Sequence, residues 1–185
     1  MRESLSGRLL VASPVLEDPN FARTVVLVCS HSEEGALGLV LNRPMTAPVR
    51  QVLLGWTGAI AEPKVVFNGG PVAPCRALAL GRTADVEEET AWATPVLPGI
   101  GMINLARVTP MVELAIDRMR VFSGHASWGA SQLETEIMRE DWFVVDALPE
   151  DALTPQPDRI WHEVLRRQPG RLALFAHFPS DPILN

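Results

Sequence analysis

Glycine and proline occur along the whole length of this chain, and this feature limits it to short secondary-structure elements. The 185 residues include 13 glycines and 16 prolines, spread through the sequence instead of gathered in one linker. Both residue types favour turns over the interiors of helices and strands, so the pattern predicts many short elements joined by tight turns. The apolar runs between them are far shorter than the roughly 20 residues of a membrane helix.

Composition and charge narrow the class of protein. With 47% hydrophobic and 21% charged residues, the chain has enough apolar material to form a packed core, and its length predicts one domain over residues 1–185. A formal net charge of −6 has the wrong sign for neutralising nucleic-acid phosphates, so no direct nucleic-acid contact is expected. The N-terminus shows no secretory pattern, so we predict a cytoplasmic protein without membrane contact, in which Cys29 and Cys75 stay reduced.

The order of apolar patterns predicts an α+β fold. Short runs rich in Val and Leu predict strands at residues 9–12, 24–30, 37–41, 65–67, 77–80, 120–123 and 142–145. Helical spacing predicts helices over 49–56, from 109 onward, and over 130–140, 158–167 and 171–177, with a short helical turn at 18–23. Strands and helices do not alternate strictly, which favours α+β over a doubly wound sheet. Residues 82–101 show no clear pattern.

Six longer sequence motifs occur in an order typical of one protein family. They are residues 7–14 (GRLLVASP), 16–21 (LEDPNF), 35–44 (GALGLVLNRP), 68–72 (NGGPV), 124–129 (GHASWG) and 132–137 (QLETEI). In these motifs the chain resembles the AlgH-like (YqgE) proteins, and the resemblance extends over nearly its whole length. It departs from the family pattern at His125, Ser127 and Ser131, where an aromatic residue or glycine is usual.

The resemblance implies a fold and little chemistry. It implies an α+β domain in which helices surround a small, partly open β-barrel or mixed sheet. The family is bacterial and has no established biochemical activity, and no cofactor is expected. One member is associated by genetics with the regulation of exopolysaccharide production, which implies a role in transcriptional regulation.

Polar residues and glycines gather at the predicted strand ends, where they could line one cleft. In Asn68-Gly69-Gly70 the two glycines could let backbone N–H groups approach an anion, although the same word also forms an ordinary tight turn. Arg43 could hold a carboxylate or phosphate, or it could pair with a carboxylate of the protein itself. The predicted site residues are His31, Asn42, Arg43, Asn68, Gly69, Gly70 and Trp128. They predict a binding module for a small anionic ligand or an acidic peptide, or one that acts through a protein partner.

Fewer residues support a catalytic site than support a binding site. Cys29 and His31, two apart on a strand, would share one face, but no second Cys or His lies at ligand spacing, so no metal is expected. Cys29 lies between apolar residues, which is typical of a packed thiol. A hydrolase could use His31 or His125 with Asp18 or a serine, but the Gly-x-Ser-x-Gly elbow is missing. The sequence therefore favours a binding module over an enzyme.

Overall fold

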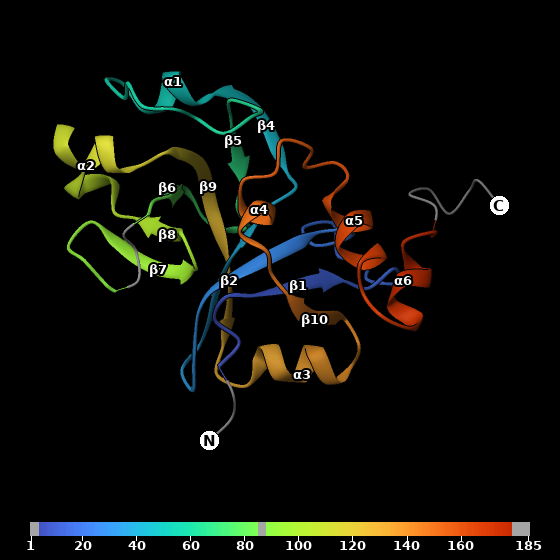
Figure 1. Ribbon diagram of the computed structural model, residues 1–185. Helices are drawn as coiled ribbons and strands as arrows, with labels where there is room; N and C mark the ends of the chain where they lie inside the picture. Colours follow the sequence, from blue (N-terminus) through green and yellow to red (C-terminus); the bar gives the residue numbers. More distant parts are fainter. Residues whose placement is uncertain (1–3, 85–87, 179–185) are drawn as a thin grey trace.

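Ten strands form one curled sheet, with the helices around it (Figure 1). The computed structural model describes residues 4–84 and 88–178. The strands are β1 (Arg8–Ala12), β2 (Val25–Ser32), β3 (Gly35–Val40), β4 (Pro44–Pro48), β5 (Val65–Asn68), β6 (Val72–Arg82), β7 (Ala93–Leu97), β8 (Ile100–Ile103), β9 (Arg118–Gly129) and β10 (Trp142–Asp146). Their order is β10-β1-β2-β3-β9-β6-β8-β7, with β4 joined through β5 to β9. Because β7 returns against β2, the sheet is a half-barrel, which confirms the predicted α+β class.

The helices are short, as the distribution of glycine and proline predicts. They are α1 (Val49–Val52), α2 (Pro110–Ala115), α3 (Gln132–Met138), α4 (Pro149–Ala152), α5 (Ile160–Arg166) and α6 (Arg171–Phe175), with a 3₁₀ turn, η1 (Leu105–Arg107). At the start of α2, the Thr109 hydroxyl accepts the Val112 N–H, and Pro110 occupies the first helical position. None of the described helices is both long and apolar enough to cross a membrane.

The structure agrees with the predicted turn after β1 and adds strands in two places where the sequence indicated none. Residues 18–23 form a single turn, as predicted, in which the Phe21 and Ala22 N–H groups donate to the Asp18 carbonyl. β4 was not predicted, since its sequence carries a proline at each end. β7 and the first two residues of β8 fall in the segment 82–101 that showed no pattern, of which residues 85–87 lie outside the described part.

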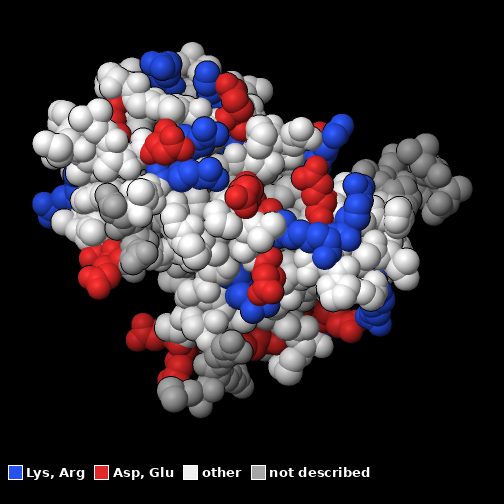
Figure 2. All heavy atoms as spheres, viewed as in Figure 1, with Lys and Arg blue, Asp and Glu red and all other residues white. Residues whose placement is uncertain are grey.

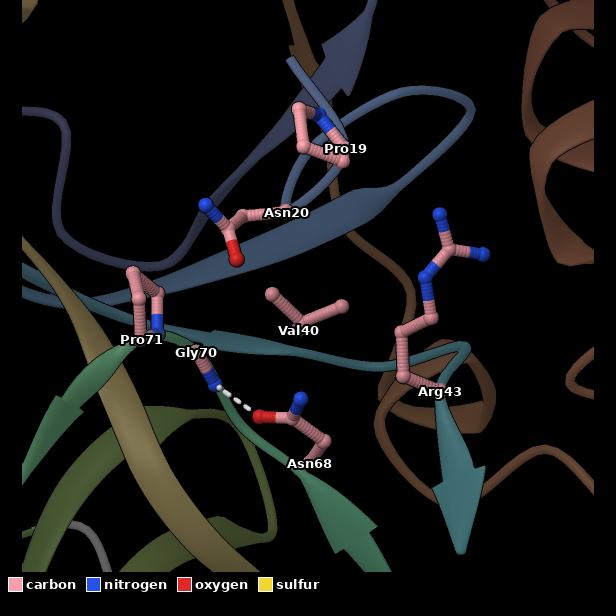
Figure 3. Close-up of a pocket in the computed structure, with 7 residues that line it drawn as sticks. All are labelled: Pro19, Asn20, Val40, Arg43, Asn68, Gly70 and Pro71. Atoms are coloured by element: carbon pink, nitrogen blue, oxygen red, sulfur yellow. Dashed lines mark hydrogen bonds between the residues drawn. The ribbon is translucent and has the colours of Figure 1, made fainter. Parts of the chain in front are cut away.

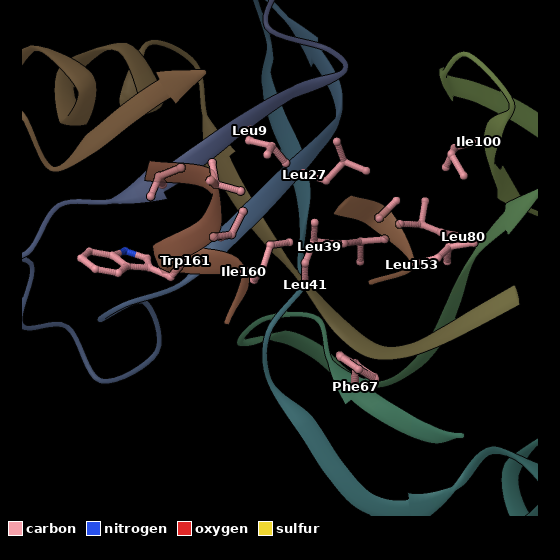
Figure 4. Packing of buried hydrophobic residues seen from close by; sticks show 14 of the residues in the cluster. Leu9, Leu27, Leu39, Leu41, Phe67, Leu80, Ile100, Leu153, Ile160 and Trp161 are labelled. Atoms are coloured by element: carbon pink, nitrogen blue, oxygen red, sulfur yellow. The ribbon is translucent and has the colours of Figure 1, made fainter. Parts of the chain in front are cut away.

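The interior of the half-barrel is filled by apolar side chains (Figure 4). Leu9, Leu27 and Leu39 come from three neighbouring strands and are fully buried. Trp161 of α5 is also buried, and its indole N–H donates to the carbonyl of Ala12 at 2.9 Å. Side chains therefore occupy the interior, and the candidate pocket lies outside it, at the strand ends.

β9 is the longest strand and connects the two halves of the sheet. Its first half pairs with β5 and β6, and its second half pairs with β3. Gly124, at φ +72°, lies where the pairing changes, so the strand continues well beyond the predicted residues 120–123. A Cβ on Gly69 or Gly70 would overlap the backbone of β9 at Gly124 and His125. The two glycines therefore allow two backbones to cross at close range.

Candidate functional site

A small polar pocket lies beside the ends of β3 and β5 (Figure 3). Its volume is about 70 Å³, and it is lined by Pro19, Asn20, Val40, Arg43, Asn68, Gly70 and Pro71. The structure thus brings together Arg43, Asn68 and Gly70 of the predicted site. Pockets for whole ligands usually occupy roughly 300–1,000 Å³, so this one matches a single carboxylate or phosphate group.

Among the described residues that line this pocket, Arg43 alone is charged. Its side chain is half-buried, and one guanidinium nitrogen donates to the carbonyl of Ala22 at 2.5 Å. Within the described residues no carboxylate lies within 4.0 Å of it, so the predicted alternative of an internal ion pair is not observed. Burial lowers the pKa of Arg43 from its usual value, because the guanidinium is partly desolvated. An anion in the pocket would supply a counter-ion.

Asn68 and the two glycines shape the wall of the pocket without forming a backbone anion nest. The Gly70 N–H donates to Oδ1 of Asn68 at 3.0 Å, and the Gly69 N–H donates to the Ser123 carbonyl at 2.9 Å. Both N–H groups are therefore occupied within the protein. The Asn68 amide nitrogen remains as a donor, and Figure 3 shows it on the side of Val40 and the pocket.

Asn42 lies at the end of β3 and positions its neighbour Arg43. Its Nδ2 donates to the Arg23 carbonyl at 2.8 Å, and its Oδ1 accepts the Val25 N–H at 3.1 Å. Only 8% of Asn42 is exposed, so the amide has no room for a ligand. These bonds fix the turn at residues 19–23 to β3, and that turn carries Pro19 and Asn20. The sequence Asp-Pro-Asn is itself a turn signal, and recognising it as such would have placed both residues at the site.

His31 and Trp128 do not line the pocket, so the predicted single cleft is divided. Nδ1 of His31 accepts the Leu5 N–H at 3.0 Å, which places its proton on Nε2, 3.3 Å from a carboxylate oxygen of Glu134. The indole N–H of Trp128 donates to Glu136 at 2.8 Å. Glu134 and Glu136 belong to α3, so both predicted site residues fasten this helix to the sheet.

Cys29 and His31 lie on opposite faces of β2, which corrects the expectation that they share one. The register of β2 against β3 shifts between Val28 and Ser30, so Cys29 sits in a β-bulge that breaks the alternation. Cys29 packs in the half-barrel interior, whereas His31 contacts α3. Burial raises the pKa of the Cys29 thiol to about 12, which disfavours the nucleophilic thiolate form at neutral pH.

The two cysteines should therefore react very differently with a thiol reagent. Cys29 is buried and Cys75 is exposed, and both are free. We expect dithionitrobenzoate to modify one equivalent rapidly in the native protein and a second only after unfolding. Cys75→Ser should abolish the rapid phase, and Cys29→Ser should leave it intact. A rapid phase that survives Cys75→Ser would contradict the placement of Cys29.

The residues of the hydrolase alternative do not assemble into a catalytic site in the described part of the chain. Asp18 accepts the Asn20 N–H at 2.8 Å within its own turn and contacts neither His31 nor His125. His125 is buried, and burial followed by the charge of Arg76 lowers its pKa. Its Nδ1 has no hydrogen-bond partner among the described residues. In the same residues, no three His, Cys, Asp or Glu side chains converge as a metal site would require.

Comparison with known proteins agrees with the fold and with the sequence motifs. The AlgH-like family model matches residues 9–173. A UPF0301 protein of Streptomyces avermitilis is 45% identical over 98% of this chain and 96% of its own length. The crystal structure of a Corynebacterium diphtheriae protein superposes with a TM-score of 0.87 at 33% identity, covering 96% of this chain and 94% of that one. The solution structure of the AlgH protein from Pseudomonas aeruginosa superposes with a TM-score of 0.70 at 25% identity. This superposition covers 98% of this chain and 100% of that one. The chain belongs to the AlgH-like family of uncharacterised proteins.

Proposed function

We propose that this protein is a non-enzymatic binding module whose pocket at Arg43 takes the carboxylate or phosphate group of a small anion. The observation that supports the proposal is the half-buried Arg43 guanidinium, which has no carboxylate partner among the described residues. A charge-assisted hydrogen bond to an anion there gains more than one between neutral groups, because the charge is already partly desolvated. The Asn68 amide adds a neutral donor on the same pocket.

A regulatory role would then pass through this ligand or through a protein partner. Direct binding to DNA is not part of the proposal, because the chain carries a formal net charge of −6. On the face shown in Figure 2, the coloured Lys and Arg side chains are interspersed with Asp and Glu. A surface that follows a phosphate backbone instead collects basic residues along one stripe.

Substitution of Arg43 tests the proposal. We expect phosphate, acetate and citrate to shift the ¹⁵N amide signals of Asn68 and Gly70 saturably in the wild-type protein. Affinity should be in the millimolar range, as suits about one or two charge-assisted contacts. Arg43→Ala should weaken binding by about tenfold to a hundredfold, because it removes the only charged group in the pocket.

Two further variants separate a specific site from general charge effects. Arg139→Ala removes the same charge from an exposed position outside the pocket and should leave binding unchanged. Asn68→Asp keeps an acceptor for the Gly70 N–H but adds a negative charge, so it should weaken anion binding by about tenfold. Equal affinity in wild type and Arg43→Ala, or equal losses in Arg43→Ala and Arg139→Ala, would refute the proposal.

A further inference from the structure

β10 is an edge strand, and its outward backbone groups at Trp142 and Val144 have no hydrogen-bond partner within the described residues. In this part of the chain it pairs with β1 on one side and with no strand on the other. The Ser13 N–H donates to the Asp141 carbonyl at 2.9 Å, which shows that residue 141 bonds toward β1. Because bonding alternates along an antiparallel strand, Phe143 and Val145 also bond toward β1. The N–H and C=O groups of Trp142 and Val144 therefore point outward.

A contact of Asp146 supports the assignment of outward-pointing backbone groups in β10. Asp146 should also point outward, and its carbonyl accepts a hydrogen bond from the Arg167 guanidinium at 3.1 Å. No such donor or acceptor reaches the outward groups of Trp142 and Val144 in the described part of the chain. Four backbone groups thus remain available with the spacing that a neighbouring strand would match.

The edge of β10 also lacks the protection that the other two edge strands carry. β4 contains Pro44 and Pro48, and β7 contains Pro95. Proline has no N–H and opposes the addition of another strand. The sequence of β10, Trp-Phe-Val-Val-Asp, contains neither proline nor lysine. Of the three edges, β10 is the one that its sequence leaves open to strand pairing.

A groove of about 360 Å³ follows this edge between α3 and α6. In Figure 1, α3 lies below β10 and α6 lies to its right. Ile137 of α3 and Leu172 of α6 give the two walls apolar surfaces. Glu140 and Arg171 form an exposed ion pair across the walls, with N and O 3.4 Å apart. The edge of β10 therefore lies in a groove whose two wall charges cancel.

We propose that this groove binds an extended, uncharged segment of a partner protein, which adds to the sheet as a strand beside β10. The free N–H and C=O groups select a peptide backbone as the ligand, and the apolar walls select β-branched or other apolar side chains on both of its faces. The neutral balance of the walls argues against a strongly acidic or basic segment. This inference is independent of the anion pocket at Arg43.

A second copy of the chain fits the groove less well than a single peptide. In that copy, β10 would lie between the same two walls, which would have to fit against those of the first copy. Specific dimers usually bury about 1,200 Å² or more, so pairing through the five residues of β10 would need further surface around the groove. A segment that enters alone meets neither obstacle.

Selection from a displayed library of random heptapeptides, with the full chain as target, tests the proposal. We expect selected peptides to be apolar and β-branched, and to slow hydrogen exchange at the Trp142 and Val144 amides of the ¹⁵N-labelled protein. The exchange of Phe143 and Val145, which already bond to β1, should change little. Failure to select any peptide, or protection at other amides only, would overturn the proposal.

Val144→Pro and Val144→Thr form a matched pair for the same experiment. Proline at 144 removes an outward N–H and no bond to β1, so the sheet should remain intact while a synthetic copy of the selected peptide binds at least about tenfold more weakly. Threonine keeps the N–H and the β-branched shape, so its affinity should stay close to that of the wild type. Equal weakening by both variants would overturn the proposal, as would concentration-dependent dimerisation that protects these amides without peptide. If Val144→Pro does not fold, the wild-type exchange pattern decides.

Discussion

Replacing Arg120 with methionine should lower the free energy of unfolding by about 3–5 kcal/mol. Arg120 is 1% exposed, and its guanidinium donates to the carbonyls of Glu62, Ala152 and Thr154 at 2.6, 3.5 and 2.8 Å. It also stacks on the Phe67 ring, 4.2 Å from the ring centroid. Methionine fills similar space but leaves three carbonyl groups without their donor.

The size of the effect depends on two opposing contributions. Burial lowers the pKa of Arg120 to about 10, so the side chain is still charged at neutral pH and its desolvation opposes folding. Methionine removes that cost, yet it also releases the segment after α4 and the turn at Glu62 from the sheet. With about 1–3 kcal/mol for each buried orphaned carbonyl, we expect the lost hydrogen bonds to dominate.

Urea unfolding of three variants separates these contributions. Arg118→Met removes an exposed arginine two residues away on the same strand and should change stability by less than about 0.5 kcal/mol. Arg120→Lys keeps a charge but cannot reach three carbonyls with a planar fork, so it should fall between the wild type and Arg120→Met. A methionine variant as stable as the wild type would contradict the prediction, because the desolvation cost of the guanidinium would then fully offset its hydrogen bonds.

Local patterns were sufficient to predict the class of fold and most of the core. The runs at residues 9–12 and 65–67 became β1 and β5 because their apolar residues are buried in the sheet. The helical spacing over residues 158–167 predicted α5, whose Ile160, Trp161, Val164 and Leu165 enter the core. These elements follow from periodicity that a short window of sequence already contains.

What the sequence did not indicate depends on contacts between distant segments. The predicted strand ended at residue 123, before Gly124, because glycine favours turns over strand interiors. β9 continues through Gly124 because β3 supplies new pairing partners beyond that point. The bulge at Cys29 moved His31 to the other face of β2, a change that strict alternation cannot anticipate. Arg43, Asn68 and Gly70 were predicted to meet because all three lie at strand ends. His31 and Trp128 met the same criterion, but their contacts are with α3.

Gly70→Ala should be comparably destabilising, with a loss of about 3–5 kcal/mol. Gly70 has φ +145°, and an alanine Cβ there would overlap the carbonyl carbon of His125 and the amide nitrogen of Ala126. These are backbone atoms of β9, so neither can turn aside as a flexible side chain could. Thermal unfolding should show a midpoint lowered by roughly 2–4 °C for each kcal/mol lost in a chain of this size.

Gly55→Ala is the matched control, because it isolates the cost of backbone conformation. Gly55 has φ +87°, and a Cβ there would meet no atom within 4 Å, so alanine should cost only about 1–2 kcal/mol. The difference between the two variants measures the overlap with β9. If Gly70→Ala is as stable as Gly55→Ala but loses anion binding, the glycine serves the ligand and not the crossing of the strands. If both stability and binding fall, the glycine supports the pocket by allowing β9 to pass beside it, as its occupied N–H group indicates.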